Sequence, residues 1–354
     1  MDRRKFLTTG AIGAAATTLA APAIAQDVRN WKLVSAWPKN LPGPGVAAQT
    51  LADRITTLSG GRINVTLYAA GEIVPGNGVF DAVSEGTAEL YHAVPAYWGS
   101  KSKGILLFGS QPFGLRADEQ FGWMYHGGGQ ALYDEMYGKF GIKPFLCGNS
   151  GPQWAGWFKN EINTLEDLNG LNMRIAGLGG EIYRKLGVNA VMMPPPEIFQ
   201  SMQSGAIDAA EWVGPMLDQA FGLQKVTKLC YLPAYNEPGA GLAIVFNRDA
   251  WAELSPDLQI ICEMAAQSVA LETQAQFDFF NAQAMESLAA DGVQFLQFSD
   301  EIVDGMRAAW LEVQDELTAA SEDVARVRES YDTYLSQANA YAKAMTIPML
   351  SGRG

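Results

Sequence analysis

The chain has 354 residues, of which 48% are hydrophobic and 18% charged, and its formal net charge is −13. Such an acidic chain disfavours nucleic acid and anionic membrane surfaces as partners. Its length allows two lobes with substantial cores, and its three cysteines allow at most one disulfide, so the cores must hold the fold.

The first 25 residues are predicted to be an export signal. A twin arginine at residues 3–4 is followed by an apolar run of small residues at 8–21 and by the small-x-small cleavage site at 23–25. The twin arginine indicates the twin-arginine route, which exports folded proteins. A membrane anchor is the alternative, but the run is too short and too rich in Ala and Gly. The mature protein is expected to begin at Gln26 and to lie in the periplasm.

From residue 28 to about 246, strand-like and helix-like segments alternate. Residues 31–35 predict a strand, 46–58 an amphipathic helix and 62–68 a second strand. This alternation is typical of α/β layers with largely parallel strands.

An internal pseudo-repeat indicates two similar lobes. Residues 79–90 and 198–209 share the same order of aliphatic, Phe, small, Gly and acidic positions. The apolar positions fall on one helix face, and Gly86 and Gly205 then stand where a left-handed residue ends a helix before a strand. Helix–Gly–strand units are also common in unrelated α/β proteins, which is the alternative.

The C-terminal part is predicted to be helical. Ser255 and Pro256 form a helix start, and residues 258–290 continue it without Gly or Pro. Residues 301–344 carry further helical periodicity. Such a tail must pack back on the lobes or on a second chain, because isolated helices are marginal in water.

The sequence offers little for an enzyme of a familiar kind. His92 and His126 are its only histidines, and it contains no zinc, haem, phosphate-loop or hydrolase motif. His92 ends an apolar strand, where a buried core histidine is the simpler interpretation.

Several polar residues interrupt apolar stretches and are candidates for ligand binding. Arg174 lies in a short predicted strand before a glycine-rich turn, and its planar fork can hold a carboxylate with two hydrogen bonds. An internal salt bridge is the alternative. Glu211 and Trp212 end the strand of the second repeat, where ligands bind in α/β sheets; pairing of Glu211 with Arg174 is the alternative.

Amide and loop residues complete the candidate set. Asn149 and Gln153 stand among glycines and aromatic residues, either as a turn or as uncharged hydrogen-bonding groups. Tyr97 follows the strand of the first repeat, and Glu237 lies in a predicted crossover between the lobes. Glu211, Gln153 and carbonyl oxygens would suit a cation that prefers oxygen ligands.

At these residues the sequence resembles the solute-binding proteins of tripartite ATP-independent periplasmic (TRAP) transporters, in particular the subgroup that binds 2-oxo acids. The matching stretches cover most of the chain and lie at residues 37–43, 70–76, 147–158, 170–174 and 207–215. The resemblance implies an α/β, two-lobed periplasmic binding protein fold with a long lobe-spanning helix. It also implies a helical C-terminal extension that mediates a swapped homodimer.

The resemblance also implies roles for individual residues. Arg174 matches the residue that clamps the ligand carboxylate. Asn149 and Tyr97 match positions that hydrogen-bond the ligand. The side chains of Gln153 and Glu211 and the carbonyl of Trp212 match the ligands of a bridging cation; one carboxylate favours sodium, with calcium as the alternative.

The sequence thus predicts a non-enzymatic binding protein that captures a small 2-oxo or 2-hydroxy monocarboxylate with a cation and delivers it to a membrane permease. The alternatives are an exported lyase or other enzyme with Glu211 as base, and a ligand-sensing partner of a membrane receptor. The expected parts are lobe 1 (26–148 and about 238–255), lobe 2 (149–237), the spanning helix (256–291) and C-terminal helices (299–347).

Overall fold

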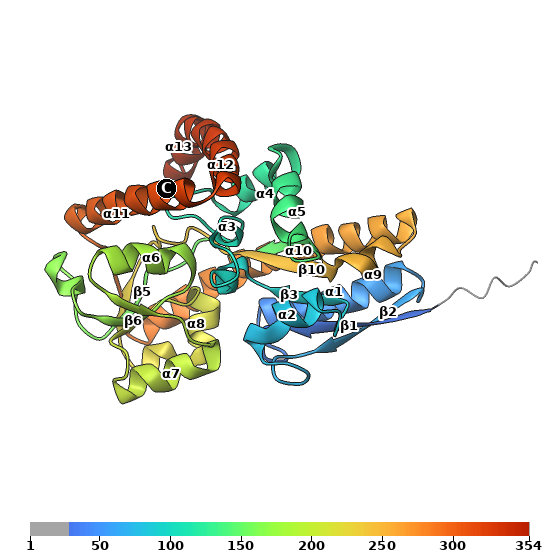
Figure 1. Ribbon diagram of the computed structural model, residues 1–354. Coiled ribbons are helices and arrows are strands. Elements are labelled where there is room, and N and C mark those ends of the chain that lie inside the picture. Colours follow the sequence, from blue (N-terminus) through green and yellow to red (C-terminus); the bar gives the residue numbers. More distant parts are fainter. Residues whose placement is uncertain (1–27, 354) are drawn as a thin grey trace, which may run out of the picture.

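The computed structural model describes residues 28–353 and shows two α/β lobes, one around each of two sheets (Figure 1). The predicted fold class is therefore confirmed. The expected export signal, residues 1–25, lies outside the described residues. Among the residues that are described, no helix is long and apolar enough to cross a membrane.

The first lobe is built on a five-stranded sheet. Its strand order is β2 (Ile63–Tyr68), β1 (Arg29–Ser35), β3 (Leu90–Ala93), β10 (Gly241–Asn247) and β4 (Ile142–Asn149). The helices of this lobe are α1 (Pro44–Leu58), α2 (Val79–Ser84), α3 (Lys103–Leu106), α4 (Ala117–His126), α5 (Gly129–Gly138) and α9 (Arg248–Ala252).

The second lobe is built on a six-stranded sheet with short strands. Its order is β11 (Gln294–Leu296), β9 (Leu229–Tyr231), β5 (Gly156–Phe158), β8 (Ala209–Ala210), β6 (Asn172–Arg174) and β7 (Asn189–Val191). Its helices are α6 (Gly177–Lys185), α7 (Pro195–Ser204) and α8 (Pro215–Phe221). The strand β11 joins this sheet from beyond the spanning helix, which the sequence did not predict.

The expectation of largely parallel strands holds for only part of each sheet. In the first sheet β10 runs antiparallel to both β3 and β4, and in the second β5 runs antiparallel to both β8 and β9. These two reversed strands are the ones that the chain enters from the other lobe. The chain leaves lobe 1 after β4 to form β5, and it returns after β9 to form β10.

The pseudo-repeat corresponds to equivalent elements in the two lobes. The helices α2 and α7 are each followed by a glycine with positive φ, 78° at Gly86 and 85° at Gly205. Each glycine precedes a short buried strand, β3 or β8, that pairs in parallel with a neighbour. A residue with a side chain would be strained at that φ, so the glycine lets the chain turn directly into the strand.

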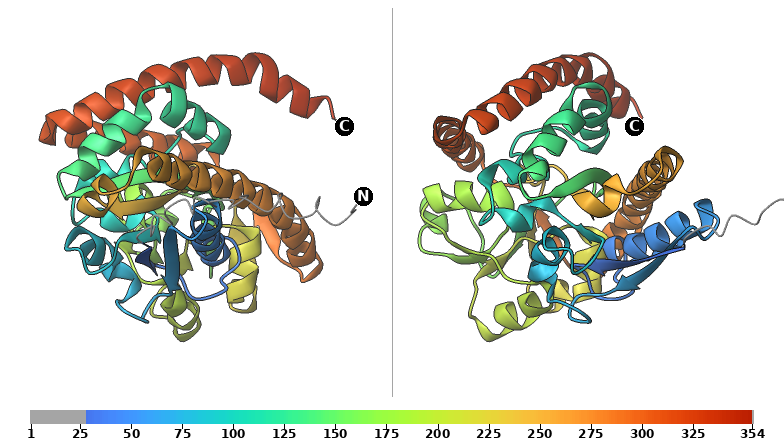
Figure 2. Two further views of the ribbon diagram at one scale, coloured as in Figure 1. Left: turned by 90° about the vertical axis from the view of Figure 1, so that its right-hand side faces the viewer. Right: turned by 45° about the vertical axis from the view of Figure 1, so that its right-hand side comes forward.

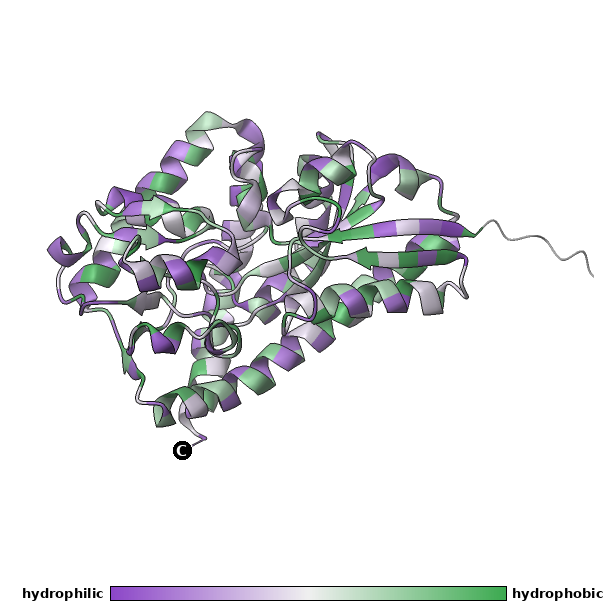
Figure 3. Ribbon diagram, turned by 90° about the horizontal axis from the view of Figure 1, so that it is seen from below, coloured by the Kyte–Doolittle hydropathy of each residue, from purple (hydrophilic) through white to green (hydrophobic). Residues whose placement is uncertain are grey.

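One helix, α10 (Pro256–Ala290), spans both lobes. Its 35 residues extend about 52 Å at the usual helical rise. Towards its N-terminal half, Arg54 of α1 donates to Ser268 at 3.0 Å; towards its C-terminal end, Asn281 accepts from the backbone N–H of Met216 in α8 at 3.0 Å. Figure 3 shows hydrophilic and hydrophobic residues alternating along its length.

The C-terminal helices pack back on the lobes, as one of the two expected arrangements requires. The helix α11 (Asp300–Ala320) packs on α6 of lobe 2, and α12 (Glu322–Tyr341) packs on α3, α4 and α5 of lobe 1 (Figure 2). The chain then continues through a π-helix (Ala342–Thr346) into α13 (Ile347–Ser351), whose side chains are exposed. Cys147, Cys230 and Cys262 are buried and free, so none of them forms a disulfide.

Candidate functional site

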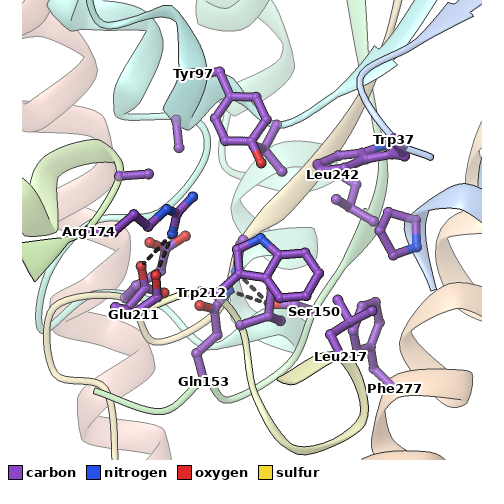
Figure 4. Close-up of a pocket in the computed structure, with 17 residues that line it drawn as sticks. Trp37, Tyr97, Ser150, Gln153, Arg174, Glu211, Trp212, Leu217, Leu242 and Phe277 are labelled. Atoms are coloured by element: carbon purple, nitrogen blue, oxygen red, sulfur yellow. Dashed lines mark hydrogen bonds and ion pairs between the residues drawn. The ribbon is translucent and has the colours of Figure 1, made fainter. Parts of the chain in front are cut away.

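A small closed cavity lies between the two lobes, and most of the predicted site residues line it (Figure 4). Its volume is about 40 Å³. One buried water needs roughly 10–15 Å³, so the cavity has room for a molecule of only a few non-hydrogen atoms. The predicted residues that line it are Tyr97, Gln153, Arg174, Glu211, Trp212 and Glu237.

Arg174 is the last residue of β6 and is only 1% exposed. It reaches the carboxyl end of a parallel strand trio, where α/β sheets bind ligands. One guanidinium nitrogen donates to the backbone carbonyl of Glu211 and lies 3.4 Å from Oε2 of the same residue. The internal ion pair that the sequence left open is therefore present, and the same guanidinium also lines the cavity.

Glu211 follows β8 directly and is as deeply buried as Arg174. Burial, followed by repulsion from Glu237, raises the pKa of its carboxyl group well above the ordinary value, against the opposing attraction of Arg174. Its Oε2 faces Arg174, whereas its Oε1 has no hydrogen-bond partner among the described residues. Buried acceptors without a partner are uncommon, and such an atom is available for a ligand or an ion.

Gln153 carries a second buried oxygen of this kind. Its amide nitrogen donates to the hydroxyl of Ser150 at 2.8 Å, and that hydroxyl also accepts from the backbone N–H of Ala240 at 2.9 Å. The amide is thereby held in one orientation. Its Oε1 is buried and has no partner within residues 28–353.

The crossover segments between the lobes position these groups. The segment after β4 carries Ser150 and Gln153, and the segment before β10 carries Glu237. The two segments bond to each other through Ser150 N–H to Ala240 O at 3.0 Å and through Ala234 N–H to Gln153 O at 3.0 Å. Site residues therefore lie on the segments that connect the two lobes.

Tyr97 faces the cavity from lobe 1, and Glu237 faces it from the crossover segment before β10. Burial raises the pKa of Glu237 to about 7, although the positive charge of Arg174 opposes the shift. Burial also raises the pKa of Tyr97 to about 12, so its hydroxyl keeps its proton at neutral pH. Tyr97 can accordingly donate a hydrogen bond to an anion.

Asn149 is placed differently from the other predicted residues. It is buried at the end of β4, but it is not among the residues that line the cavity. Its amide nitrogen donates to Gln120 Oε1 at 2.7 Å, and its Oδ1 accepts from the N–H of Gly151 at 2.8 Å. In this conformation the side chain holds the crossover turn, as the turn alternative supposed.

The sequence reasoning missed the apolar part of the lining. Its larger side chains come from lobe 1, lobe 2 and α10: Trp37, Pro44, Val94, Leu217, Leu242 and Phe277. Apolar side chains that line a cavity have the same sequence pattern as those in a core, so no local signal separates them. The predicted core role of His92 is confirmed, since the side chain is fully buried.

Comparison with known proteins places the chain in a family. The pattern of the family described as bacterial extracellular solute-binding protein, family 7, matches residues 35–321. The chain belongs to this family. A curated relative from a Nostoc species, named a monocarboxylate 2-oxoacid-binding periplasmic protein, is 37% identical over 350 residues, which are 96% of each chain.

Two solved structures share both the fold and a substantial part of the sequence. A TRAP periplasmic solute-binding protein from Pseudoalteromonas atlantica, with bound sodium and pyruvate, is 33% identical at a TM-score of 0.90 and covers 92% of this chain and 99% of its own. A TRAP solute-binding protein from Bordetella bronchiseptica is 31% identical at a TM-score of 0.89, covering 92% and 96%. The latter is a mixed-occupancy dimer with calcium and picolinate in one site. The family of TRAP solute-binding proteins that the sequence resembled is thereby confirmed.

Proposed function

We propose that this protein binds a small 2-oxo or 2-hydroxy monocarboxylate together with a cation and delivers it to a membrane permease. The observation that carries the proposal is the meeting of one buried arginine with two buried oxygens, Gln153 Oε1 and Glu211 Oε1, around one small cavity; neither oxygen has a hydrogen-bond partner among residues 28–353. Nε and Nη1 of Arg174 donate to Met193 and Glu211, whereas Nη2 has no hydrogen bond among residues 28–353 and can donate to a carboxylate. The two oxygens are ligands of the type that sodium and calcium prefer.

The balance of charges in the cavity favours binding of a cation together with the ligand. Arg174 is faced by the buried carboxyl groups of Glu211 and Glu237, and burial raises the pKa of both. Arg174 can neutralise only one negative charge, so an ionised Glu211 and an incoming carboxylate together would leave one negative charge uncompensated. A buried anion without compensation is costly. A cation held by Gln153, Glu211 and the carbonyl oxygen of Trp212 restores the balance. An acid with an oxygen beside its carboxylate can chelate that cation.

The nature of the cation follows from the donors. Gln153 and Trp212 contribute neutral oxygens and Glu211 a single carboxylate, which favours sodium, with calcium as the alternative. The relatives support either ion, because the Pseudoalteromonas protein holds sodium with pyruvate and the Bordetella protein holds calcium with picolinate.

Binding is proposed to proceed by hinge closure. An open form exposes Arg174, and the ligand stabilises the closed form because only the closed form surrounds it. The moving parts are the proposed lobes, residues 26–148 with about 238–255 and residues 149–237. All strands of the first sheet from β1 to β4, together with β10, fall within the first lobe, apart from Asn149 at the end of β4.

Calorimetry with pyruvate tests the proposal. The wild-type protein, dialysed against a chelator into sodium-free buffer, should bind pyruvate weakly, and added sodium or calcium should restore binding. In Glu211→Gln, added cation should raise the affinity for pyruvate much less, because the substitution removes the only carboxylate proposed to bind the cation. Equal affinity for pyruvate with and without the two ions would refute the proposed role of the cation. Absence of pyruvate binding under every condition would refute the proposed class of ligand.

The protein is proposed to be a receptor rather than an enzyme. An enzyme at this site would use Glu211 as a base, with Arg174 holding the substrate. Incubation with pyruvate and the cation, followed by NMR of the small molecules, should show no product and no exchange of the methyl protons with deuterated solvent. Loss of the methyl signal catalysed by wild type but not by Glu211→Gln would establish the enzyme instead.

The homodimer is proposed from two exposed apolar surfaces. The outer side of α10 exposes Leu271 and Phe279 at 72% and 60%, and the C-terminal segment exposes Met345 and Ile347, each at 56%. Clusters of exposed apolar side chains are typical of interaction sites. The dimeric state of the Bordetella relative supports a second copy of this chain as the partner.

Delivery to a permease requires export. The family is extracellular and the Nostoc relative is named periplasmic, so the protein acts outside the cytoplasm. We propose that the twin arginine at residues 3–4 directs export by the twin-arginine route. Replacement of both arginines by lysine should retain the precursor in the cytoplasm in a cell-fractionation assay, whereas unchanged export would exclude that route.

A further inference from the structure

The cavity has a polar side and an apolar side. Figure 4 shows Arg174 and Glu211 on one side and Trp37, Leu242 and Phe277 on the other. A ligand whose carboxylate meets Arg174 therefore directs the rest of its carbon chain towards this apolar wall. Leu217 of α8 lies on the same side, so the wall combines residues of lobe 1, lobe 2 and α10, and its position is fixed only when the lobes close.

Trp37 is the largest side chain of the apolar wall and is held at several points. Its indole Nε1–H donates to Nδ1 of His92 at 2.8 Å. Its backbone N–H donates to the hydroxyl of Ser35 at 3.2 Å, and its carbonyl accepts from the N–H of Ala70 at 3.0 Å. The ring also lies 5.8 Å from that of Tyr97, centroid to centroid. The indole therefore has little freedom to move away from a longer ligand.

His92 is suited to hold the indole at all ordinary pH values. It is completely buried in β3, where Trp37, Ser35 and Ala36 are its close neighbours along β1 and the loop that follows. Burial lowers the pKa of His92 to about 3, so the ring is neutral and Nδ1 remains an acceptor. This histidine looked like an ordinary core residue in the sequence, but the structure gives it a partner in the cavity wall.

We infer that Trp37 determines the length of carbon chain that the site accepts, and that His92 is the positioning residue that holds the indole in place. The inference rests on the proposed function, since it concerns the same cavity. The space of about 40 Å³ suits the shortest 2-oxo acids. A longer chain would have to displace an indole that is bonded to His92 and packed against Tyr97.

The test is a calorimetric series of pyruvate, 2-oxobutyrate and 2-oxopentanoate, all with sodium chloride and with calcium chloride. The wild-type protein should bind pyruvate best and lose affinity with each added methylene. Trp37→Leu should reverse this order, with a gain of up to about fourfold in affinity for each methylene that the enlarged wall buries. Trp31→Leu is the matched control, because Trp31 is a buried lobe 1 tryptophan that does not line the cavity. It should lower the melting temperature and leave the order unchanged.

The positioning role of His92 has its own test. His92→Leu removes the acceptor and should shift the preference towards 2-oxobutyrate, whereas His92→Asn offers an oxygen in place of Nδ1 and should restore the wild-type order. If His92 had only a structural role, both variants would be less stable, but they would rank the three acids in the same order of affinity. If Trp37→Leu does not fold, Trp37→Phe, which loses only the N–H donor and part of the ring, takes its place.

The outcomes separate this inference from the proposed function. Pyruvate binding with the same chain-length order in wild type and in the Trp37 variant would overturn the inference and leave the proposed function intact. An unchanged order in His92→Leu would overturn the role of His92. Failure of the wild-type protein to bind any of the three acids would overturn the proposed function and the inference together.

Discussion

At the scale of single residues, the site is a concentration of buried charge. Arg174, Glu211 and Glu237 are each at most 6% exposed and line the same cavity. Removing one member of such a set is more damaging than the net worth of its contacts, because the remaining charges stay buried without a partner.

Arg174→Ala should abolish measurable binding of pyruvate at micromolar concentrations. Truncation of one partner of a buried charge pair costs about 2–5 kcal/mol, which is a loss of at least thirtyfold in affinity. Calorimetry measures the loss, and circular dichroism checks that the fold is kept. Arg184→Ala is the control, since Arg184 is an exposed arginine on the next helix, α6. This variant should bind pyruvate with the affinity of the wild type. Wild-type affinity in the Arg174 variant would remove this residue from the site.

Without ligand, the protein should become less stable as the pH rises from about 4.5 to 7. Burial raises the pKa of Glu237 from 4.5 to about 7, so the folded state keeps a proton that the unfolded state has released. The stabilisation is complete below pH 4.5 and is lost as the pH passes 7, by at most about 3 kcal/mol. Glu237→Gln cannot ionise. Its melting temperature should exceed that of the wild type at pH 8 and vary less between pH 5 and pH 8; parallel curves would contradict the prediction.

At the scale of elements, the structure shows the lobes in contact across the cavity. The Nζ of Lys103 in α3 of lobe 1 pairs with the carboxylate of Glu181 in α6 of lobe 2. At the start of the same helix, a Cβ added to Gly177 would lie 3.3 Å from the Cβ of Ala96. The two lobes therefore approach each other closely at Gly177. The helix α6 begins three residues after Arg174, and it carries both Gly177 and Glu181, which contact lobe 1.

Lys103→Glu should weaken ligand binding by a modest factor, about two- to fivefold, because it replaces an attraction between the lobes by a repulsion. The pair is partly exposed, which limits its worth to roughly 1 kcal/mol. The double variant Lys103→Glu with Glu181→Lys should recover most of the lost affinity. Calorimetry at low and high salt measures both; a double variant as weak as the single one would show that the pair does not contribute to closure.

At the scale of the whole molecule, two long helical structures connect the lobes. The helix α10 crosses both without a break, whereas the α11–α12 pair connects them through the bend at Ser321, whose hydroxyl caps α12. The chain beyond α12 does not cover the lobes, and it exposes Met345, Ile347, Met349 and Leu350. These side chains and the outer face of α10 form the surface that we assign to a second copy of the chain.

Deletion of residues 342–354 should convert the dimer into a monomer without loss of ligand binding. The deleted segment buries little in its own chain, so its removal should hardly change the melting temperature. Light scattering after size-exclusion chromatography measures the mass, and calorimetry with pyruvate measures binding. A full-length protein that is monomeric at high micromolar concentration would contradict the proposed homodimer.

The sequence by itself determined many of the helices and turns and indicated the polar residues that meet at the cavity. The Ser255-Pro256 pair and the periodicity after it located the long helix, which begins at Pro256, and the glycines at 86 and 205 marked equivalent turns in two lobes. These features could be predicted because they are local: a helix face, a left-handed turn and an arginine between apolar neighbours each lie within a few residues. The resemblance to a known family then linked Arg174, Gln153 and Glu211 to one site.

Only the tertiary structure decided which residues line the cavity and which hydrogen bonds the polar residues around it make. Trp37, Leu217 and Phe277 come from three distant parts of the chain, and nothing local distinguishes them from core residues. Asn149 was grouped with the ligand-binding residues, whereas its amide is bonded to Gln120 and Gly151. His92 holds Trp37 only because the loop after β1 passes over β3. Such relations depend on contacts between distant segments, and a linear pattern does not encode their geometry.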